Sequence, residues 1–111
     1  MRGLALTIDR LDGNAFKIAL RGELDLEYAY TFDEELRRIE EMEPECICLD
    51  LRELTFLDSS GLSRLVAARR RARRAGRRLV LIRGSAAVQR LFALTAVDEA
   101  FEIVNEFPAR A

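Results

Sequence analysis

The chain of 111 residues lacks histidine and tryptophan altogether. Without histidine it cannot build a Ser-His-Asp triad, a Cys-His nucleophile pair or most zinc sites. It also lacks a glycine-rich phosphate-binding loop and carboxylates at the spacing of metal ligands. We therefore expect a protein that is not an enzyme and that uses no cofactor and no metal.

Long hydrophobic runs are absent as well. No segment approaches the ~18 consecutive apolar residues that a membrane span requires. The N-terminal segment reaches the charged residues Asp9, Arg10 and Asp12 too early to contain the apolar core of a signal peptide. We expect the only cysteines, Cys46 and Cys48, to be small buried side chains in a reducing compartment. The sequence thus predicts a cytoplasmic protein with no membrane partner.

The net charge is close to zero, at −1 from 18 basic and 19 acidic residues. The two signs are nevertheless separated along the chain. Residues 1–58 hold 15 acidic and 7 basic residues, a net charge of −8, whereas residues 59–111 hold 4 acidic and 11 basic residues, a net charge of +7. A near-neutral total argues against a protein dedicated to nucleic acid or to a membrane surface unless the charge is unevenly distributed, so the separation of charge requires its own explanation.

Arginine is concentrated in one segment, with eight residues between Arg64 and Arg78. One interpretation is the solvated face of an amphipathic helix that also pairs with the glutamate-rich helix before it. The alternatives are a docking surface for a partner with an acidic surface, and a nucleic-acid site. No aromatic residue occurs between Leu57 and Phe92, although aromatic side chains commonly accompany basic ones in nucleic-acid sites. We therefore expect no nucleic-acid partner.

Patterns of apolar residues predict the order of the elements. Strands are expected over residues 4–8, 15–20, 46–51, 79–82 and 101–104, and helices over residues 32–42, 58–75 and 85–94. The turn Asp12-Gly13-Asn14 joins the first two strands as a hairpin. Strands that alternate with helices favour parallel pairing. The prediction is a single α/β domain over residues 1–111, with a mixed, mostly parallel sheet of about five strands, an N-terminal hairpin and three to four helices.

Single residues indicate where elements end and which faces are buried. Gly22 is expected to end the second strand, and Gly76 is expected to close the second helix as a residue that follows its last turn. In the first helix we expect Met42 on the apolar face and Asp33 on the polar face. In the third helix we expect Leu94 to point inward.

The segment Asp58-Ser59-Ser60-Gly61 lies between a predicted buried strand and a predicted helix. Ser59 and Ser60 are good N-cap residues, which is a purely structural interpretation. Serine without a nearby base is a poor nucleophile, yet it can accept a phosphate if a partner supplies ATP and the catalytic base. A helix N-terminus favours such an anion. Gly61 in the first turn suggests the close approach of another group.

Three segments together resemble the STAS-domain anti-anti-sigma factors, which are anti-sigma factor antagonists. The segment Phe56-Leu57-Asp58-Ser59-Ser60-Gly61-Leu62 resembles their phosphorylation loop, and Gly22-Glu23-Leu24-Asp25 resembles a second signature. The segment Ser85-Ala86-Ala87-Val88-Gln89-Arg90-Leu91-Phe92 is similar to their third helix. The resemblance spans about residues 4–104 and implies a STAS-like fold.

The resemblance also implies a function. Such proteins bind an anti-sigma factor that is also a serine kinase, and this binding releases the sigma factor. The kinase phosphorylates the first serine of the loop, which is Ser59 here, and the phosphorylated form dissociates. A metal-dependent serine phosphatase restores binding. The family therefore implies a phosphoprotein that acts through protein–protein interaction in transcription regulation.

The partner-binding residues that the resemblance implies lie around Ser59. Asp58 and Ser60 would hold and flank the phosphoacceptor, and Gly61 would permit close approach of the kinase. Asp25 would lie at the same end of the sheet as Asp58, although a turn or a helix cap also explains it. Leu57 and Leu62 complete the expected set of partner-binding residues.

Two other functions stay open. A STAS module of a lipid-transport or signalling assembly would have the same fold. A nucleic-acid-binding module would use the arginine-rich helix. Residues 105–111, which include Pro108, are also shorter than the last helix of many relatives, so a fourth helix is in doubt.

Overall fold

The computed structural model describes residues 3–95 and 101–107. The elements follow one another as the sequence predicts: two strands, then helices and strands in alternation. Their bounds are β1 Leu4–Leu11, β2 Ala15–Leu24, α1 Leu26–Glu40, β3 Cys46–Leu57, α2 Ser59–Ala75, β4 Arg78–Ile82, α3 Ala86–Leu94 and β5 Glu102–Val104.

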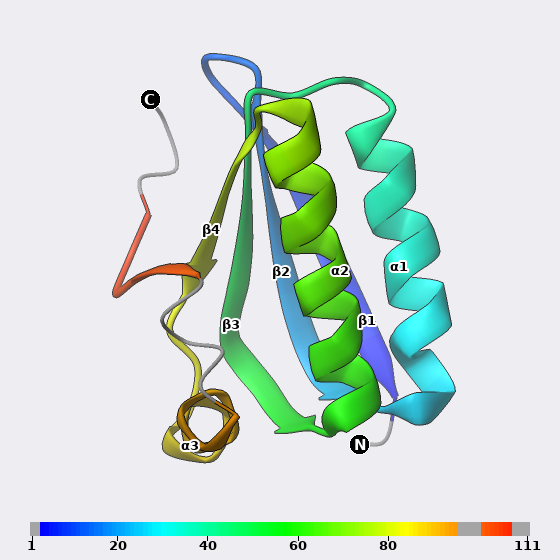
Figure 1. The fold of residues 1–111 in the computed structure, drawn as a ribbon, viewed down its shortest axis with the longest axis vertical. Coiled ribbons are helices and arrows are strands. Elements are labelled where there is room, and N and C mark those ends of the chain that lie inside the picture. The colour runs from blue at the N-terminus through cyan, green and yellow to red at the C-terminus, as the bar shows by residue number, and fades with distance from the viewer. Residues whose placement is uncertain (1–2, 96–100, 108–111) are drawn as a thin grey trace.

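The five strands form one sheet in the order β1-β2-β3-β4-β5. β1 is antiparallel to β2, and every other neighbouring pair is parallel. Because successive strands are added in one direction and crossovers are right-handed, α1 and α2 must cover the same face of the sheet. Figure 1 shows these two helices side by side, with α2 in front of β2 and α1 to its right. The α/β fold with a mixed, mostly parallel sheet is confirmed.

A single hydrophobic core fills the space between this sheet face and the helices. Alternate residues of the strands point into it, as the two-residue period of a strand requires. The helices contribute residues at spacings of three and four. The completely or almost completely buried members include Ile18, Leu20, Phe32, Leu36, Ile47, Leu49, Leu51, Leu65, Leu81 and Phe92.

Three strands extend well beyond their predicted ends, and the first of them, β1, continues past residue 8 to Leu11. β2 does not end at Gly22, because this residue takes a φ of +108° at an irregularity in the pairing with β3, and the strand continues to Leu24. Glycine adopts such a φ without steric cost, so a bulge forms where the sequence predicts an end. β3 continues in the same way to Leu57, paired with the end of β2. β2 and β3 therefore reach the same edge of the sheet.

Three side-chain predictions are wrong. Met42 is 53% exposed because α1 ends at Glu40, so helical spacing no longer applies to it. Leu94 is 77% exposed on the last turn of α3. Asp33 is 3% exposed because arginines from α1 and α2 surround its carboxylate.

The predicted ends of the later helices can be compared in part. Gly76 follows α2 with a φ of +69°, which confirms the left-handed residue expected there. Residues 105–107 are not helical. The rest of the segment in which a fourth helix was in doubt, residues 108–111, lies outside the described residues.

Candidate functional site

The candidate site lies at the edge where β2 and β3 end together. Leu24 and Leu57 are partners in the parallel register, so the residues that follow them, Asp25 and Asp58, come out of the sheet side by side. This arrangement confirms that the two aspartates lie at the same end of the sheet. In Figure 1 it is the lower edge, where both α1 and α2 begin.

Each aspartate caps one helix. Asp25 accepts hydrogen bonds from the backbone N–H groups of Glu27 at 3.1 Å and Tyr28 at 3.3 Å, so the helix-cap interpretation of this residue is confirmed. Asp58 accepts from the N–H of Gly61 at 2.9 Å through Oδ1 and from the N–H of Leu26 at 3.1 Å through Oδ2. One carboxylate therefore ties the starts of α1 and α2 together.

The N-cap of α2 is thus Asp58 and neither of the serines. The expectation that Ser59 or Ser60 caps the helix is wrong, because the carboxylate of Asp58 already accepts from the third N–H of the helix. Ser59 is the first residue of α2 and is exposed, whereas Ser60 is half-buried. The cap leaves the Ser59 side chain accessible at a helix N-terminus.

Gly61 does make a close approach, but to its own chain. A Cβ at this position would collide with the carbonyl oxygen of Leu24 and would come within 2.8 Å of Leu24 Cγ and Leu57 Cδ1. Gly61 is buried, and so are Leu57 and Leu62, which belong to the core. These three buried residues pack beneath the site and hold its backbone in place. Their role in partner binding stays a prediction.

A groove of about 350 Å³ opens between α1 and α2, and Ser60 and Ser63 belong to its lining. Apolar side chains on its rim are exposed: Leu26 at 76% and Tyr30 at 61%. Phe56, 49% exposed, adds an apolar side chain near the end of β3. The groove is lined by Leu26, Ala29, Tyr30, Ser60, Ser63, Arg64 and Ala67.

The sequence patterns do not identify this groove. These patterns place the start of the first helix near Phe32. Leu26 and Tyr30 therefore fall outside the predicted helix, and their one-turn spacing is not recognised as helical. That spacing is the signal that could have found the exposed apolar pair, since residues four apart share one side of a helix.

Charged groups join α1 and α2 behind the groove. Arg64 Nη1 lies 3.4 Å from Asp33 Oδ2 and its guanidinium carbon lies 6.0 Å from the centre of the Tyr30 ring. Arg71 Nη2 lies 3.1 Å from Asp33 Oδ1, and Arg37 Nε donates to Asp33 Oδ2 at 2.9 Å. Burial opposes ionisation of Asp33, but the hydrogen bond from Arg37 and the charges of Arg71 and Arg37 outweigh it and hold the pKa of Asp33 below its ordinary value.

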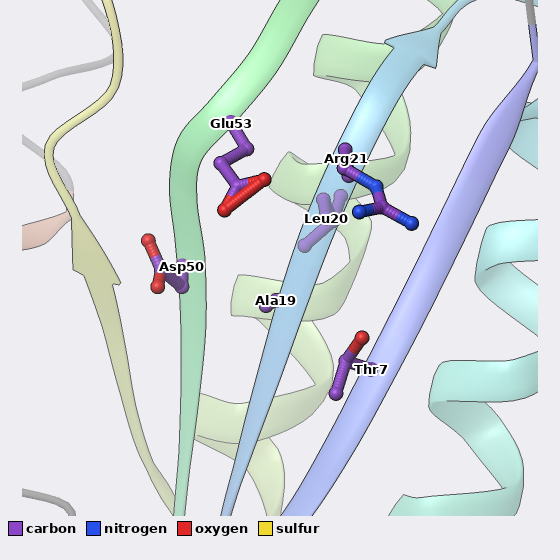
Figure 2. A pocket seen from close by; sticks show the side chains of 6 residues that line it. All are labelled: Thr7, Ala19, Leu20, Arg21, Asp50 and Glu53. Carbon is purple, nitrogen blue, oxygen red and sulfur yellow. The ribbon is translucent and has the colours of Figure 1, made fainter.

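The opposite face of the sheet has a smaller hollow of about 80 Å³, shown in Figure 2, which includes Thr7, Arg21 and Glu53. Asp50 also lines it, but its carboxylate accepts two hydrogen bonds from Arg52, at 3.0 and 2.8 Å. Ligand pockets commonly measure about 300–1,000 Å³, so this hollow is suited to a few water molecules.

The two cysteines lie on β3. Cys46 and Cys48 are free, and burial raises the pKa of Cys48 to about 12, so its thiol stays protonated. Among residues 3–95 and 101–107 there is no group of three or more side chains that could hold a metal ion. In the same part of the chain, no helix is long and apolar enough to cross a membrane.

Comparison with known proteins gives consistent matches over nearly the whole chain. A family model described as "Mlab, STAS domain" matches residues 8–105. The anti-sigma-B factor antagonist of Listeria monocytogenes is 30% identical over 102 residues, which are 92% of this chain and 90% of the relative.

Two solved structures share the fold. The crystal structure of an anti-sigma factor antagonist from Mycobacterium paratuberculosis has a TM-score of 0.81 at 23% identity, over 95% of this chain and 88% of that one. The Bacillus cell fate determinant SpoIIAA in its phosphorylated form has a TM-score of 0.72 at 19% identity, over 92% and 93% of the two chains. The two solved structures share the fold, and the family model and the Listeria relative show that the chain belongs to the STAS-domain family of anti-sigma factor antagonists.

Proposed function

We propose that this protein is an anti-sigma factor antagonist in the cytoplasm. It binds an anti-sigma factor that is also a serine kinase, and it thereby releases the sigma factor. The observation that carries this proposal is the exposed Ser59 at the start of α2, directly after the Asp58 cap and directly before Ser60, which lines an open groove. The names of the Listeria and Mycobacterium relatives support it. In this role the protein is a binding partner and the kinase supplies the catalysis.

Phosphorylation of Ser59 switches the protein off. A phosphoserine carries about −1.5 to −2 charges at neutral pH, and backbone N–H groups with the helix dipole stabilise it at a helix N-terminus. Asp58 already accepts from Gly61 and Leu26, so the fold does not need the phosphate as a cap. The new charge therefore acts on the surface that meets the partner. SpoIIAA, which shares the fold, is known in a phosphorylated form.

The other site residues divide into two roles. Asp25 and Asp58 hold the starts of α1 and α2, and Ser60 flanks the phosphoacceptor at the groove. Leu57, Gly61 and Leu62 are buried and set the backbone beneath Ser59. The partner contacts the exposed rim of the groove between α1 and α2. The buried residues keep the backbone of this surface in the position that the partner recognises. A serine phosphatase that removes the phosphate restores binding.

The direct test is phosphate transfer. The protein is incubated with the purified anti-sigma factor kinase of its own cell and ATP, and the modified peptide is mapped by mass spectrometry. We expect phosphate on Ser59 in the wild type and in Ser60→Ala, and none in Ser59→Ala. Phosphate on Ser60 alone, or on neither serine, would contradict the assignment.

A STAS module of another assembly, such as a lipid-transport or signalling complex, is the second candidate, because the description of the matching family model, "Mlab, STAS domain", names no sigma factor. Both candidates use the same fold. Binding to the kinase separates them, since only the first candidate must bind it and must lose affinity for it after phosphorylation of Ser59.

A further inference from the structure

The second half of α2 has three exposed arginines on its outer side, Arg70, Arg73 and Arg74, which we call the arginine stripe. Their spacings of three and four place them on one side of the helix. The buried residues Leu65 and Ala72 lie on the opposite side. The stripe therefore faces solvent.

The arginines of α2 that face α1 are already paired. Arg64 and Arg71 contact Asp33, and Arg71 also donates to the two carboxylate oxygens of Glu40 at 2.7 and 3.1 Å. Within residues 3–95 and 101–107, the guanidinium groups of the stripe make no hydrogen bond or ion pair. The acidic side chains of α1 thus neutralise the inner arginines of α2 and leave the stripe as uncompensated positive charge.

The stripe lies on the same side of α2 as the phosphoacceptor. Positions 59, 63, 66, 70 and 73 follow one another in steps of four and three, and such steps return to one side of a helix. Ser59 and Ser63 are exposed along this line. The rise of about 1.5 Å per residue puts the stripe roughly 16–22 Å from Ser59. An interface of ordinary size, about 800 Å² on each partner, covers both.

We propose that the arginine stripe binds an acidic segment of the same kinase that engages Ser59. This inference rests on the proposed function and deepens it, because it assigns the second contact and its chemistry. Attraction between opposite charges mainly accelerates association and orients the partner, and salt weakens it. The stripe thus draws the kinase along the outer side of α2 and brings its active site to the helix N-terminus.

An acidic protein segment fits better than a nucleic acid or a membrane. The stripe is short, and Glu41 and Glu43 are exposed just beyond the end of α1, where Glu43, Ala75 and Arg77 line a common hollow. An extended polyanion such as a nucleic acid would lie close to these carboxylates, which would repel it. A short acidic segment can bind the stripe without reaching them.

The test compares two full-length variants with the same charge change. The stripe variant is Arg70→Gln/Arg73→Gln/Arg74→Gln, and the control is Arg21→Gln/Arg38→Gln/Arg90→Gln, whose three exposed arginines lie on β2, α1 and α3. Association with the purified kinase is measured at about 50 and 300 mM salt. We expect the stripe variant to associate about ten-fold more slowly at low salt and to lose most of the salt dependence, and the control to stay within about two-fold of the wild type.

A second probe does not depend on the kinase. A fluorescent glutamate-rich peptide should bind the wild type and the control at low salt and should bind the stripe variant several-fold more weakly. Circular dichroism verifies that α2 is intact in each variant.

Each outcome has a defined meaning. Equal association of all three proteins with the kinase overturns the stripe proposal and leaves the proposed function standing. Failure of the wild type to bind the kinase refutes the proposed function and this extension together. Loss of affinity of the stripe variant for duplex DNA or for anionic vesicles, with unchanged affinity for the kinase, overturns the proposal in favour of those ligands.

Discussion

Asp58 joins two helices that begin far apart in the chain. Its carboxylate accepts from the N–H of Gly61, three residues on, and from the N–H of Leu26, which precedes it by 32 residues. The same residue stands directly before the proposed phosphoacceptor. Its negative charge is therefore used inside the fold, and Ser59 carries the change that a partner detects.

For Gly61→Ala, the sign of the change in the free energy of unfolding tests whether Gly61 is closely packed. Replacing glycine with alanine in an open helix position stabilises it by about 0.5–1 kcal/mol. At Gly61 the added methyl group meets the carbonyl oxygen of Leu24, so Gly61→Ala should instead lower the free energy of unfolding by about 1–3 kcal/mol. Chemical denaturation measures this change. Ser63→Ala, an exposed site on the same helix, serves as the control and should change the value by less than about 0.5 kcal/mol.

A stabilised Gly61→Ala protein would contradict the close contact between Gly61 and the carbonyl oxygen of Leu24. If the variant instead keeps its stability and loses only kinase binding, the close approach that matters is the partner's. The two measurements together separate the structural role of Gly61 from its predicted role in binding.

The contact between α1 and α2 combines apolar packing with a buried carboxylate. Asp33 is surrounded by Arg37 of its own helix and by Arg64 and Arg71 of α2. A buried charge is costly unless it is paired, and removing one member of such a group leaves the others uncompensated. The position of α2 relative to α1 therefore depends on Asp33.

Asp33→Asn should lower the free energy of unfolding by about 1–3 kcal/mol at neutral pH. The amide keeps the shape of the carboxylate but loses the charge that attracts three arginines. Denaturant titration measures the loss. Glu34→Gln, an exposed neighbour, is the matched control and should have little effect.

The difference between wild type and Asp33→Asn should also depend on pH. The pKa of Asp33 is lowered in the folded protein, so its contribution to stability is fully present above its unfolded pKa of about 3.9. It is lost as the pH falls through the folded value. The two proteins should therefore converge in stability below about pH 4, and a constant difference down to lower pH would argue against ionisation as the cause.

Most elements are predictable from local patterns, and the exceptions have physical causes. The alternation on β2 and the helical spacing of Leu62 and Leu65 on α2 reflect a core on one side, and the structure has it there. Gly22 does not end its strand, because a bulge uses the same conformational freedom as a turn. Asp33 is buried because two of its three counter-charges, Arg64 and Arg71, come from a helix 31 or more residues later.

At the scale of the whole molecule, the crossovers between strands bring the acidic and the basic halves of the chain together. The acidic half contributes α1 and the basic half contributes α2, and the fold places these helices next to each other (Figure 1). The arginines of α2 that face α1 form ion pairs with acidic residues of α1, whereas the arginine stripe faces solvent. A phosphate on Ser59 would change the net charge from −1 to about −2.5 to −3, which is small for the molecule and large for one helix end.

This contrast predicts that the switch acts on binding and leaves the fold intact. Ser59→Asp should change the free energy of unfolding by about 0.5 kcal/mol or less, because a negative charge in the first turn of a helix is tolerated or favourable. Its affinity for the kinase should fall at least several-fold, while Ser59→Ala should bind normally. Thermal unfolding and a binding assay on the same samples check both statements. Marked destabilisation of Ser59→Asp would indicate a conformational switch instead.

The order of strands and helices, the single core and the loop with Ser59 follow from local sequence, because periodicity and turn residues are read over a few positions. Long-range contacts require the folded chain. The bridge from Asp58 to Leu26, the burial of Asp33 and the groove beside Ser60 each join segments about 30 residues apart. No local pattern encodes such distances, since they arise only when right-handed crossovers bring α1 and α2 onto one face of the sheet.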